Sequence, residues 1–177
     1  QGKYIVRYRD RLYVLNSRLG GVDYPYRSYF SPIPVAGALG TWNTSTTDFF
    51  DVDYGEALMG GAAMWDKLVL FTEYAMWFYD QVQLKKVYSI GCSNHKTIKE
   101  ISAYLIWANA DGVWLSSGGM PQNIGGEIID FIRAGTPANF FGSVVDEEYR
   151  LYVGTVTVDT VSYANCELIF NLPTQSW

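Results

Sequence analysis

The segment WDKLVLFTEYAMWFYD, residues 65–80, holds two short apolar runs separated by a polar break at Glu73. Two such runs around a short polar break are typical of a β-hairpin. Nearly the same arrangement returns three more times along the chain. The leading apolar runs of the four segments are residues 10–15, 66–71, 102–107 and 148–153.

The four runs recur at a spacing typical of repeated supersecondary units. Their leucines Leu12, Leu68, Leu105 and Leu151 are 56, 37 and 46 residues apart. When the repeating unit is built of strands, such spacing is most often that of propeller blades. Partner strands are predicted downstream, at residues 27–31, 75–79, 112–116 and 166–170. Further strands are predicted at 4–8, 48–52, 57–64, 84–89, 98–102 and 140–145, which brings most units close to the four strands of a blade.

The links inside the hairpins differ in length. Residues 72–74 and 109–112 are short and contain turn-forming side chains, so we expect tight turns there. Residues 17–25 form a longer link with Gly and Pro, which predicts an inserted loop.

One segment has helical rather than strand spacing. Ile124, Ile128, Phe131 and Ile132 follow the i, i+4, i+7, i+8 pattern, and Gly135 is a stop signal. We therefore predict an all-β fold, a β-propeller or a propeller fragment of about four blades. Residues 1–177 would form one domain, with one short helix near residues 127–133.

The composition sets limits on function. Hydrophobic residues make up 49% of the chain and aromatic residues 16%, which suits a packed, strand-rich domain. A net charge of -5 argues against direct nucleic-acid binding, because phosphate binding needs clustered basic residues. No apolar stretch is long enough for a membrane helix, so we expect no membrane partner. Cys92 and Cys166 are interpreted as free thiols, with a disulfide as the alternative.

Catalytic and metal-binding patterns are weak. His95 is the only histidine, and we interpret it as a turn residue rather than a triad member. Acid/base carboxylates could come from Asp51, Asp53, Asp146 and Glu148, and a Ca²⁺ site could form from Asp51, Asp53 and Glu56. Solvated loops explain these acidic residues more simply, so we predict no catalytic, cofactor or metal site.

Exposed aromatic residues are candidates for contact with a partner or a glycan. Tyr24, Tyr26 and Trp42 are expected in the loop of the first unit, where they could stack on sugar rings or fill a partner's pocket. The alternative, which we favour for Trp42, is that its ring caps the edge of a blade.

The order of several motifs resembles propeller-bearing structural proteins of tailed bacteriophages, either of the tail nozzle or packaged-DNA stabilisation type or of a related tail propeller. The resemblance covers roughly residues 3–132. It is carried by Tyr26–Ser31, Thr41-Trp42-Asn43, Asp48–Val52, the hairpin 66–79, Gly91–Ile98, Ala110–Trp114 and Ile124–Ile132. It implies a virion protein of the tail or neck that contacts other virion proteins and assembles into a ring.

Three hypotheses follow from these observations. The first is a non-enzymatic structural component of a phage virion, a rigid propeller platform for subunit or host contacts. The second is a propeller that binds or cleaves carbohydrate, for which a host surface glycan would be the partner. The third is a cellular interaction propeller, which ranks last because the Trp-Asp and Gly-His signatures at blade ends are missing.

Overall fold

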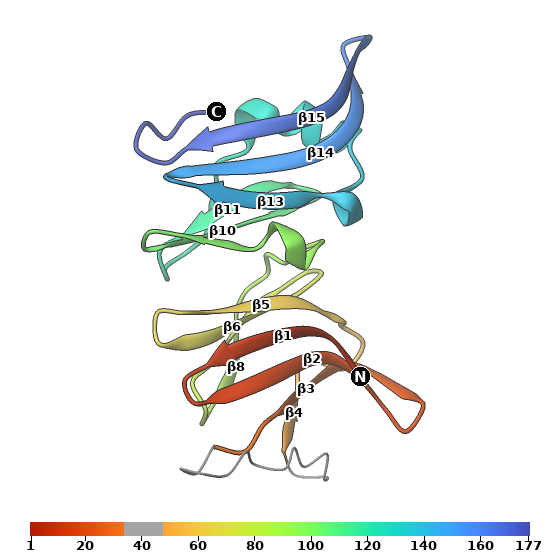
Figure 1. The fold of residues 1–177 in the computed structure, drawn as a ribbon, viewed down its shortest axis with the longest axis vertical. Coiled ribbons are helices and arrows are strands. Elements are labelled where there is room, and N and C mark those ends of the chain that lie inside the picture. Colours follow the sequence, from red (N-terminus) through yellow and green to blue (C-terminus); the bar gives the residue numbers. More distant parts are fainter. Residues whose placement is uncertain (34–47) are drawn as a thin grey trace. The chain divides into compact units, whose positions relative to one another are not determined.

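Strands dominate the structure, a computed structural model that describes residues 1–33 and 48–177 (Figure 1). The described chain is 58% strand and 9% helix and forms four antiparallel sheets, none of which closes on itself. The all-β prediction is confirmed at this level. The chain divides into two compact units, unit 1 at residues 1–91 and unit 2 at residues 92–177.

Unit 1 holds two four-stranded sheets whose strand order follows the chain. The first sheet is made of β1 (Gly2–Tyr8), β2 (Arg11–Leu19), β3 (Val22–Phe30) and β4 (Phe49–Asp51). The second is made of β5 (Leu58–Met64), β6 (Lys67–Thr72), β7 (Met76–Tyr79) and β8 (Leu84–Tyr88). Each is therefore a simple antiparallel meander, as the repeat predicts.

Unit 2 also holds two sheets of successive antiparallel strands. One contains β9 (Lys99–Ile101), β10 (Tyr104–Asn109), β11 (Gly112–Ser116) and β12 (Gln122–Asn123). The other contains β13 (Phe141–Val145), β14 (Glu148–Val158) and β15 (Val161–Asn171). The predicted helix is confirmed as α1 (Ile129–Ala134), which follows a 3-10 turn at Gly126–Ile128; two further 3-10 turns lie at His95–Thr97 and Pro137–Asn139.

The first hairpin of each sheet closes with a two-residue turn at an equivalent place. The turns are residues 9–10, 65–66, 102–103 and 146–147. Their first residues have left-handed φ values of 49°, 53°, 54° and 54°, at Arg9, Trp65, Ser102 and Asp146. Turns with positive φ match the twist of the flanking strands, so each one sets the register of its sheet. The repeat seen in the sequence is therefore accompanied by a positive φ at the first residue of each turn, although only the 65–66 turn also has a positive φ at its second residue, Asp66.

The prediction of a loop at residues 17–25 is wrong. Strand β2 continues to Leu19, Gly20 and Gly21 form a two-residue turn with φ of 58° and 88°, and β3 begins at Val22. Pro25 fits within β3 because the β2–β3 pairing is irregular between Leu15 and Ser17, where it leaves ladder positions unpaired. The result is a long hairpin instead of a loop (Figure 1).

Each unit has its own hydrophobic core. In unit 1 the buried ring of Tyr13 lies 5.9–6.3 Å from the ring centroids of Tyr8, Phe30, Phe50 and Tyr79. Burial raises the pKa of the Tyr13 hydroxyl. The core of unit 2 is built from Ile101, Ile106, Ala108, Val113, Leu115, Ile128, Ile132, Phe140, Tyr149, Leu151, Val153, Val156 and Phe170. The helix α1 contributes Ile132 to that core and packs against β14.

The turn between β10 and β11 gives a stability prediction. Gly112 has φ of 147°, and a Cβ there would lie 2.8 Å from the amide atoms of Asn123. That amide is held in place, since it donates to the Asp111 carbonyl and accepts from the Gly125 N–H. We expect Gly112→Ala to cost about 1–3 kcal/mol in urea unfolding. Gly119→Ala is the control, because nothing lies within 4 Å of its Cβ position; equal urea midpoints for the two variants would contradict the prediction.

Candidate functional site

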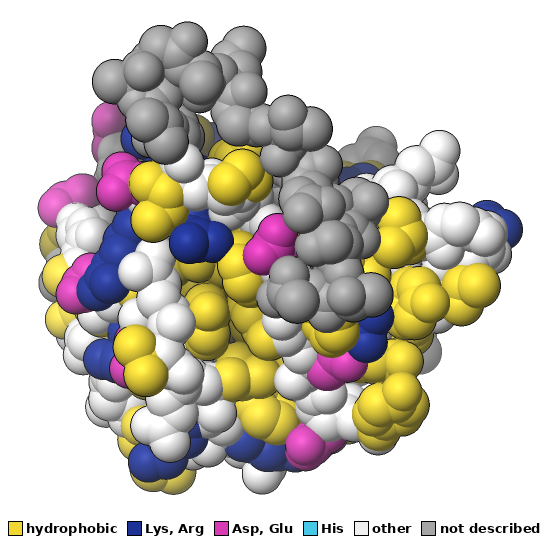
Figure 2. Space-filling model, turned by 90° about the horizontal axis from the view of Figure 1, so that it is seen from below, with side chains coloured by type: hydrophobic (Ala, Val, Ile, Leu, Met, Phe, Trp, Pro, Cys, Tyr) yellow, Lys and Arg dark blue, Asp and Glu magenta, His cyan; other side chains and the backbone are white. Residues whose placement is uncertain are grey.

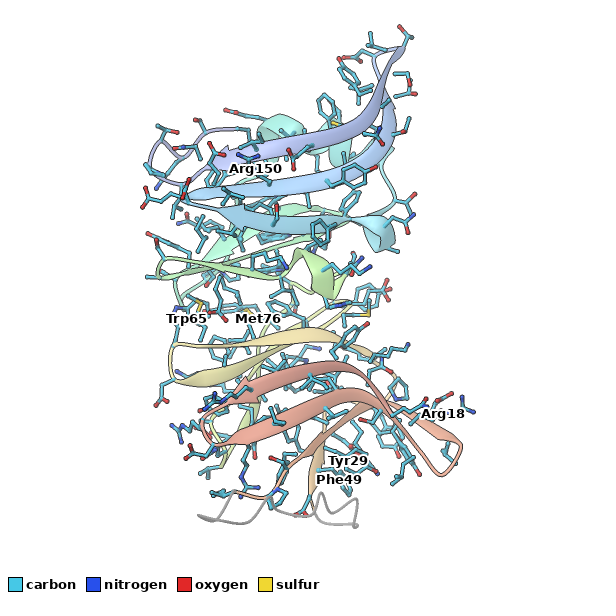
Figure 3. All side chains as sticks on the ribbon, viewed as in Figure 1. Arg18, Tyr29, Phe49, Trp65, Met76 and Arg150 are labelled. Atoms are coloured by element: carbon cyan, nitrogen blue, oxygen red, sulfur yellow. The ribbon has the colours of Figure 1, made fainter. Side chains whose placement is uncertain are left out.

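Arg27 on β3 organises a group of aromatic and acidic side chains in unit 1. Its guanidinium donates to both carboxylate oxygens of Asp51, at 2.7 Å from Nε and 2.8 Å from the second terminal nitrogen. The same group lies 3.6 Å from the ring centroid of Phe49 and 4.6 Å from that of Tyr24. Figure 3 shows Phe49 beside Tyr29, whose ring centroid is 5.7 Å away. The Arg27 guanidinium is therefore held by two-point hydrogen bonding and by ring stacking.

This ion pair is largely shielded from water. The Arg27 and Asp51 side chains are only 16% and 23% exposed. The hydrogen bonds to Asp51 raise the pKa of Arg27 further above its usual value. Asp51 is thus committed to a structural ion pair, which explains why an acidic residue ends the short strand β4.

A second cation, Lys86 on β8, draws the two neighbouring carboxylates together. Its Nζ lies 3.7 Å from Asp53 and 3.1 Å from Glu56, and the Thr72 hydroxyl also donates to Glu56. Because β4 ends at Asp51, strand alternation does not extend to Asp53. Asp51 and Asp53 therefore contact different cations. Within residues 1–33 and 48–177, no three His, Cys, Asp or Glu side chains gather where they could hold a metal ion.

The remaining candidates for acid/base chemistry lie in unit 2. Asp146 is the first residue of the β13–β14 turn, and Glu148 on β14 accepts from Arg150 at 2.8 Å. His95 lies in the 3-10 turn, as predicted for a turn residue. Burial, together with Lys96 and Lys99, lowers the pKa of His95, so its imidazole is neutral near pH 7.

The aromatic candidates have separate roles. Tyr24 and Tyr26 lie on β3 and not in a loop, which corrects their predicted position. Tyr24 packs on Arg27, while the Tyr26 ring lies 4.4 Å from the ring of Tyr54, and the two hydroxyls are 3.1 Å apart. Tyr54 is 81% exposed, so this tyrosine pair is open to a partner. Trp42 lies outside the described residues.

The surface of unit 1 mixes charge with apolar groups. Figure 2 shows hydrophobic side chains in the middle of the visible face, with basic and acidic side chains next to one another around them. Exposed apolar side chains of this unit include Ile5, Leu12, Val22, Ile33 and Val82. Acidic side chains interrupt the basic ones on the described part of this face, whereas a phosphate backbone needs a continuous basic surface.

Cys92 opens unit 2 and is part of a buried hydrogen-bond network. The Sγ atom donates to the Asn94 carbonyl at 3.2 Å, and the Thr97 hydroxyl donates to the same carbonyl at 2.8 Å. The Tyr149 hydroxyl donates to the Thr97 carbonyl at 3.0 Å. Burial raises the pKa of the Cys92 thiol to about 11. Both cysteines are free, as the sequence predicts.

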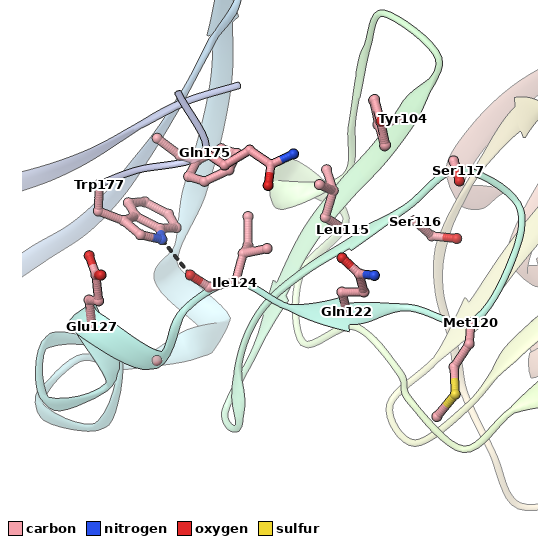
Figure 4. Close-up of a pocket in the computed structure, with 12 residues that line it drawn as sticks. Tyr104, Leu115, Ser116, Ser117, Met120, Gln122, Ile124, Glu127, Gln175 and Trp177 are labelled. Carbon is pink, nitrogen blue, oxygen red and sulfur yellow. Dashed lines mark hydrogen bonds between the residues drawn. The ribbon is translucent and has the colours of Figure 1, made fainter. Parts of the chain in front are cut away.

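A pocket that the sequence analysis missed lies in unit 2 (Figure 4). It encloses about 540 Å³ and is lined from β10, β11, β12, the 3-10 turn, β15 and the segment after β15. Its lining includes Tyr104, Leu115, Ser116, Ser117, Met120, Gln122, Ile124, Gly126, Glu127, Phe170, Gln175 and Trp177. These residues are scattered along the chain without motif spacing, so no sequence signal predicts the pocket.

The segment after β15 is fixed against the pocket by several contacts. The indole N–H of Trp177 donates to the Ile124 carbonyl at 2.6 Å, and its ring lies 5.3 Å from that of Phe170. Asn171 accepts from the backbone N–H and the hydroxyl of Thr174, and its own N–H donates to the Ser176 carbonyl. One wall of the pocket is therefore ordered by hydrogen bonds before any ligand arrives.

No family model matches this chain, and no curated protein matches it significantly. Among the residues that the structure describes, no helix is long and apolar enough to cross a membrane.

The Arg27–Asp51 pair gives a second stability prediction. Arg27→Lys removes the two-point hydrogen bond and the stacking on Phe49, and we expect it to lower the free energy of unfolding by about 1–2 kcal/mol. Arg18→Lys is the matched control, since its pair with Asp23 is 3.6 Å long and exposed to solvent. Chemical denaturation measures both variants, and similar losses would mean that the shielded pair adds nothing.

The two thiols should react at different rates. Cys92 is fully buried with a pKa of about 11, whereas Cys166 is partly exposed, so a maleimide should label Cys166 first in the folded protein. Mass spectrometry of the labelled peptides checks the order of labelling; faster labelling of Cys92 would show that this network opens readily.

The raised pKa of the Cys92 thiol also makes stability depend on pH. The contribution of the protonated thiol to the free energy of unfolding is complete below about pH 9 and is lost as the pH rises toward 11.

Proposed function

We propose that this chain is a non-enzymatic structural component of a phage virion, in the tail or neck. Its four sheets would be blades of a β-propeller or of part of one. The platform would hold subunit or host contacts on its hairpins and loops, while the sheets supply rigidity. The order of motifs that resembles phage tail propellers supports the virion assignment, and the fold supports the platform.

The succession of meander sheets is the observation that carries this proposal. Four sheets follow one another along the described chain, and the first hairpin of each has a two-residue turn whose first residue has a positive φ. In a propeller, each blade is an antiparallel meander of about four strands. Repetition of one supersecondary unit favours a scaffold, because each unit stabilises its neighbours without requiring a central catalytic cleft.

The carboxylates also support a structural role. Asp51, Glu56 and Glu148, which the enzyme and calcium readings would use, are paired with Arg27, Lys86 and Arg150. Each of these carboxylates is held by a basic side chain, which leaves fewer of its oxygens for a substrate or a metal ion.

Strand β15 is the proposed assembly edge. It is the outer strand of a three-stranded sheet, and along the described chain its far side pairs only at Asn171, with Ser176. Unpaired strand edges readily accept another strand. We infer that a second copy of the chain covers it, because β15 and its turn carry Asp159 and Glu167 whereas β1 carries Lys3 and Arg7. Opposite charges favour contacts between copies.

Negative-stain electron microscopy and light scattering test the platform role. We expect rings or higher oligomers of the purified chain, and we expect added salt to shift them toward monomers because salt screens the charge contacts. A chain that stays monomeric at high protein concentration, and that hydrolyses any of a panel of glycans, would favour the carbohydrate-active alternative.

The assembly edge can be tested separately. Ile169 on β15 is 39% exposed, and Ile169→Lys places a charge on the edge that discourages strand addition. We expect the oligomer fraction to fall at equal thermal stability. Val145→Lys on β13 is the control, because Val145 is an exposed aliphatic residue, 46% accessible, on another strand of the same sheet. Equal oligomer fractions for both variants would exclude β15 as the contact.

A further inference from the structure

We propose that the pocket of unit 2, described above, binds a neutral saccharide of one or two rings. The cavity of about 540 Å³ falls within the range of about 300–1,000 Å³ that is usual for small-ligand sites. This binding site goes beyond the structural role, and ring assembly does not depend on it.

The polar lining suits a ligand that is rich in hydroxyl groups. Gln122 on β12 and Gln175 after β15 are exposed, and neither amide side chain is engaged by another described residue. Each amide offers both donors and an acceptor, which is the combination that sugar hydroxyl groups also present. Figure 4 shows the two amides and the ring of Trp177 extending into the same pocket from different segments.

The apolar lining suits the C–H faces of a pyranose ring. Tyr104 and Trp177 are half-buried, and Leu115 and Ile124 lie in the same wall. Aromatic rings provide flat apolar area at a low cost in side-chain entropy. The Trp177 ring is already held by its hydrogen bond to the Ile124 carbonyl and by its contact with Phe170. Ligand binding therefore costs little conformational entropy at this side chain.

The charge of the site selects against anionic ligands. Glu127 is the one charged residue among those that line the pocket, and acidic side chains outnumber basic ones by nine to four in residues 92–177. A phosphate or uronate group would therefore approach a negative surface without a basic partner. Neutral saccharides avoid this repulsion, and Glu127 can accept a hydrogen bond from a hydroxyl group.

Saturation-transfer NMR with lactose, maltose, N,N′-diacetylchitobiose and methyl α-mannoside tests the proposal on the full chain. We expect at least one of these sugars to bind below about 10 mM and to shift one indole N–H signal, which Trp177→Phe removes and thereby assigns. The double variant Gln122→Ala/Gln175→Ala should weaken binding about tenfold, because it deletes two hydrogen-bonding side chains.

Gln83→Ala is the matched control, since Gln83 is an exposed glutamine in unit 1. Thermal unfolding of every variant shows whether the fold is kept. The proposal is overturned if none of the four sugars binds the wild-type chain, or if the double variant binds as well as the control. It is also overturned if galacturonate or sialyllactose binds more tightly than every neutral sugar.

Discussion

The two-residue turn that opens each sheet is the constraint on which the rest of the structure depends. The first residue of each turn has a left-handed φ, which is sterically unfavourable for residues that have a Cβ atom. These first residues are Arg9, Trp65, Ser102 and Asp146. The turn helps to fix the pairing register of the two strands that it joins. The register in turn decides which face of each strand packs against the core. In unit 1 two such turns are joined, since the Arg9 side chain makes a two-point hydrogen bond to Asp66 and the Tyr8 hydroxyl donates to the Asp66 carbonyl.

Apolar periodicity was enough to predict most strands and the helix, because burial alone dictates that pattern. The β6–β7 hairpin and α1 fall within a few residues of their predicted positions. The pairing of residues 13–15 with residues 28–30 was predicted, but the extension of the β2–β3 hairpin through residues 17–25 was missed for a physical reason. Gly20 and Gly21 suit a two-residue turn, but Pro25 normally ends a strand, and only the irregular pairing opposite Asn16 lets β3 continue past it. Such an irregularity arises from tertiary pairing, which no local pattern reveals.

Side-chain chemistry was predicted less well than backbone structure, because partners come from distant positions. Asp51 and Asp53 look like a catalytic pair when only the intervening valine is considered. Their partners, Arg27 and Lys86, lie 24 and 33 residues away in sequence. Arg27 reaches Asp51 from the neighbouring strand β3, whereas Lys86 reaches Asp53 from β8 of the other sheet. The pocket of unit 2 poses the same problem, since Gln122 and Gln175 become neighbours only through the fold.

The repeated turns and meanders and the segments that depart from the repeat therefore contribute differently to the structure. Repeated turns and meanders give each sheet a fixed shape, and buried side chains such as Tyr13 and Tyr149 hold it. The departures from the repeat are the long β2–β3 and β14–β15 hairpins, the latter bent at Gly154, and the ordered segment that carries Trp177 (Figure 1). These departures carry exposed groups on a rigid base, which keeps the entropic cost of binding low. Side chains at the tips of the long hairpins can therefore vary while the register is kept, because the register is set by the two-residue turns and by the apolar faces of the strands.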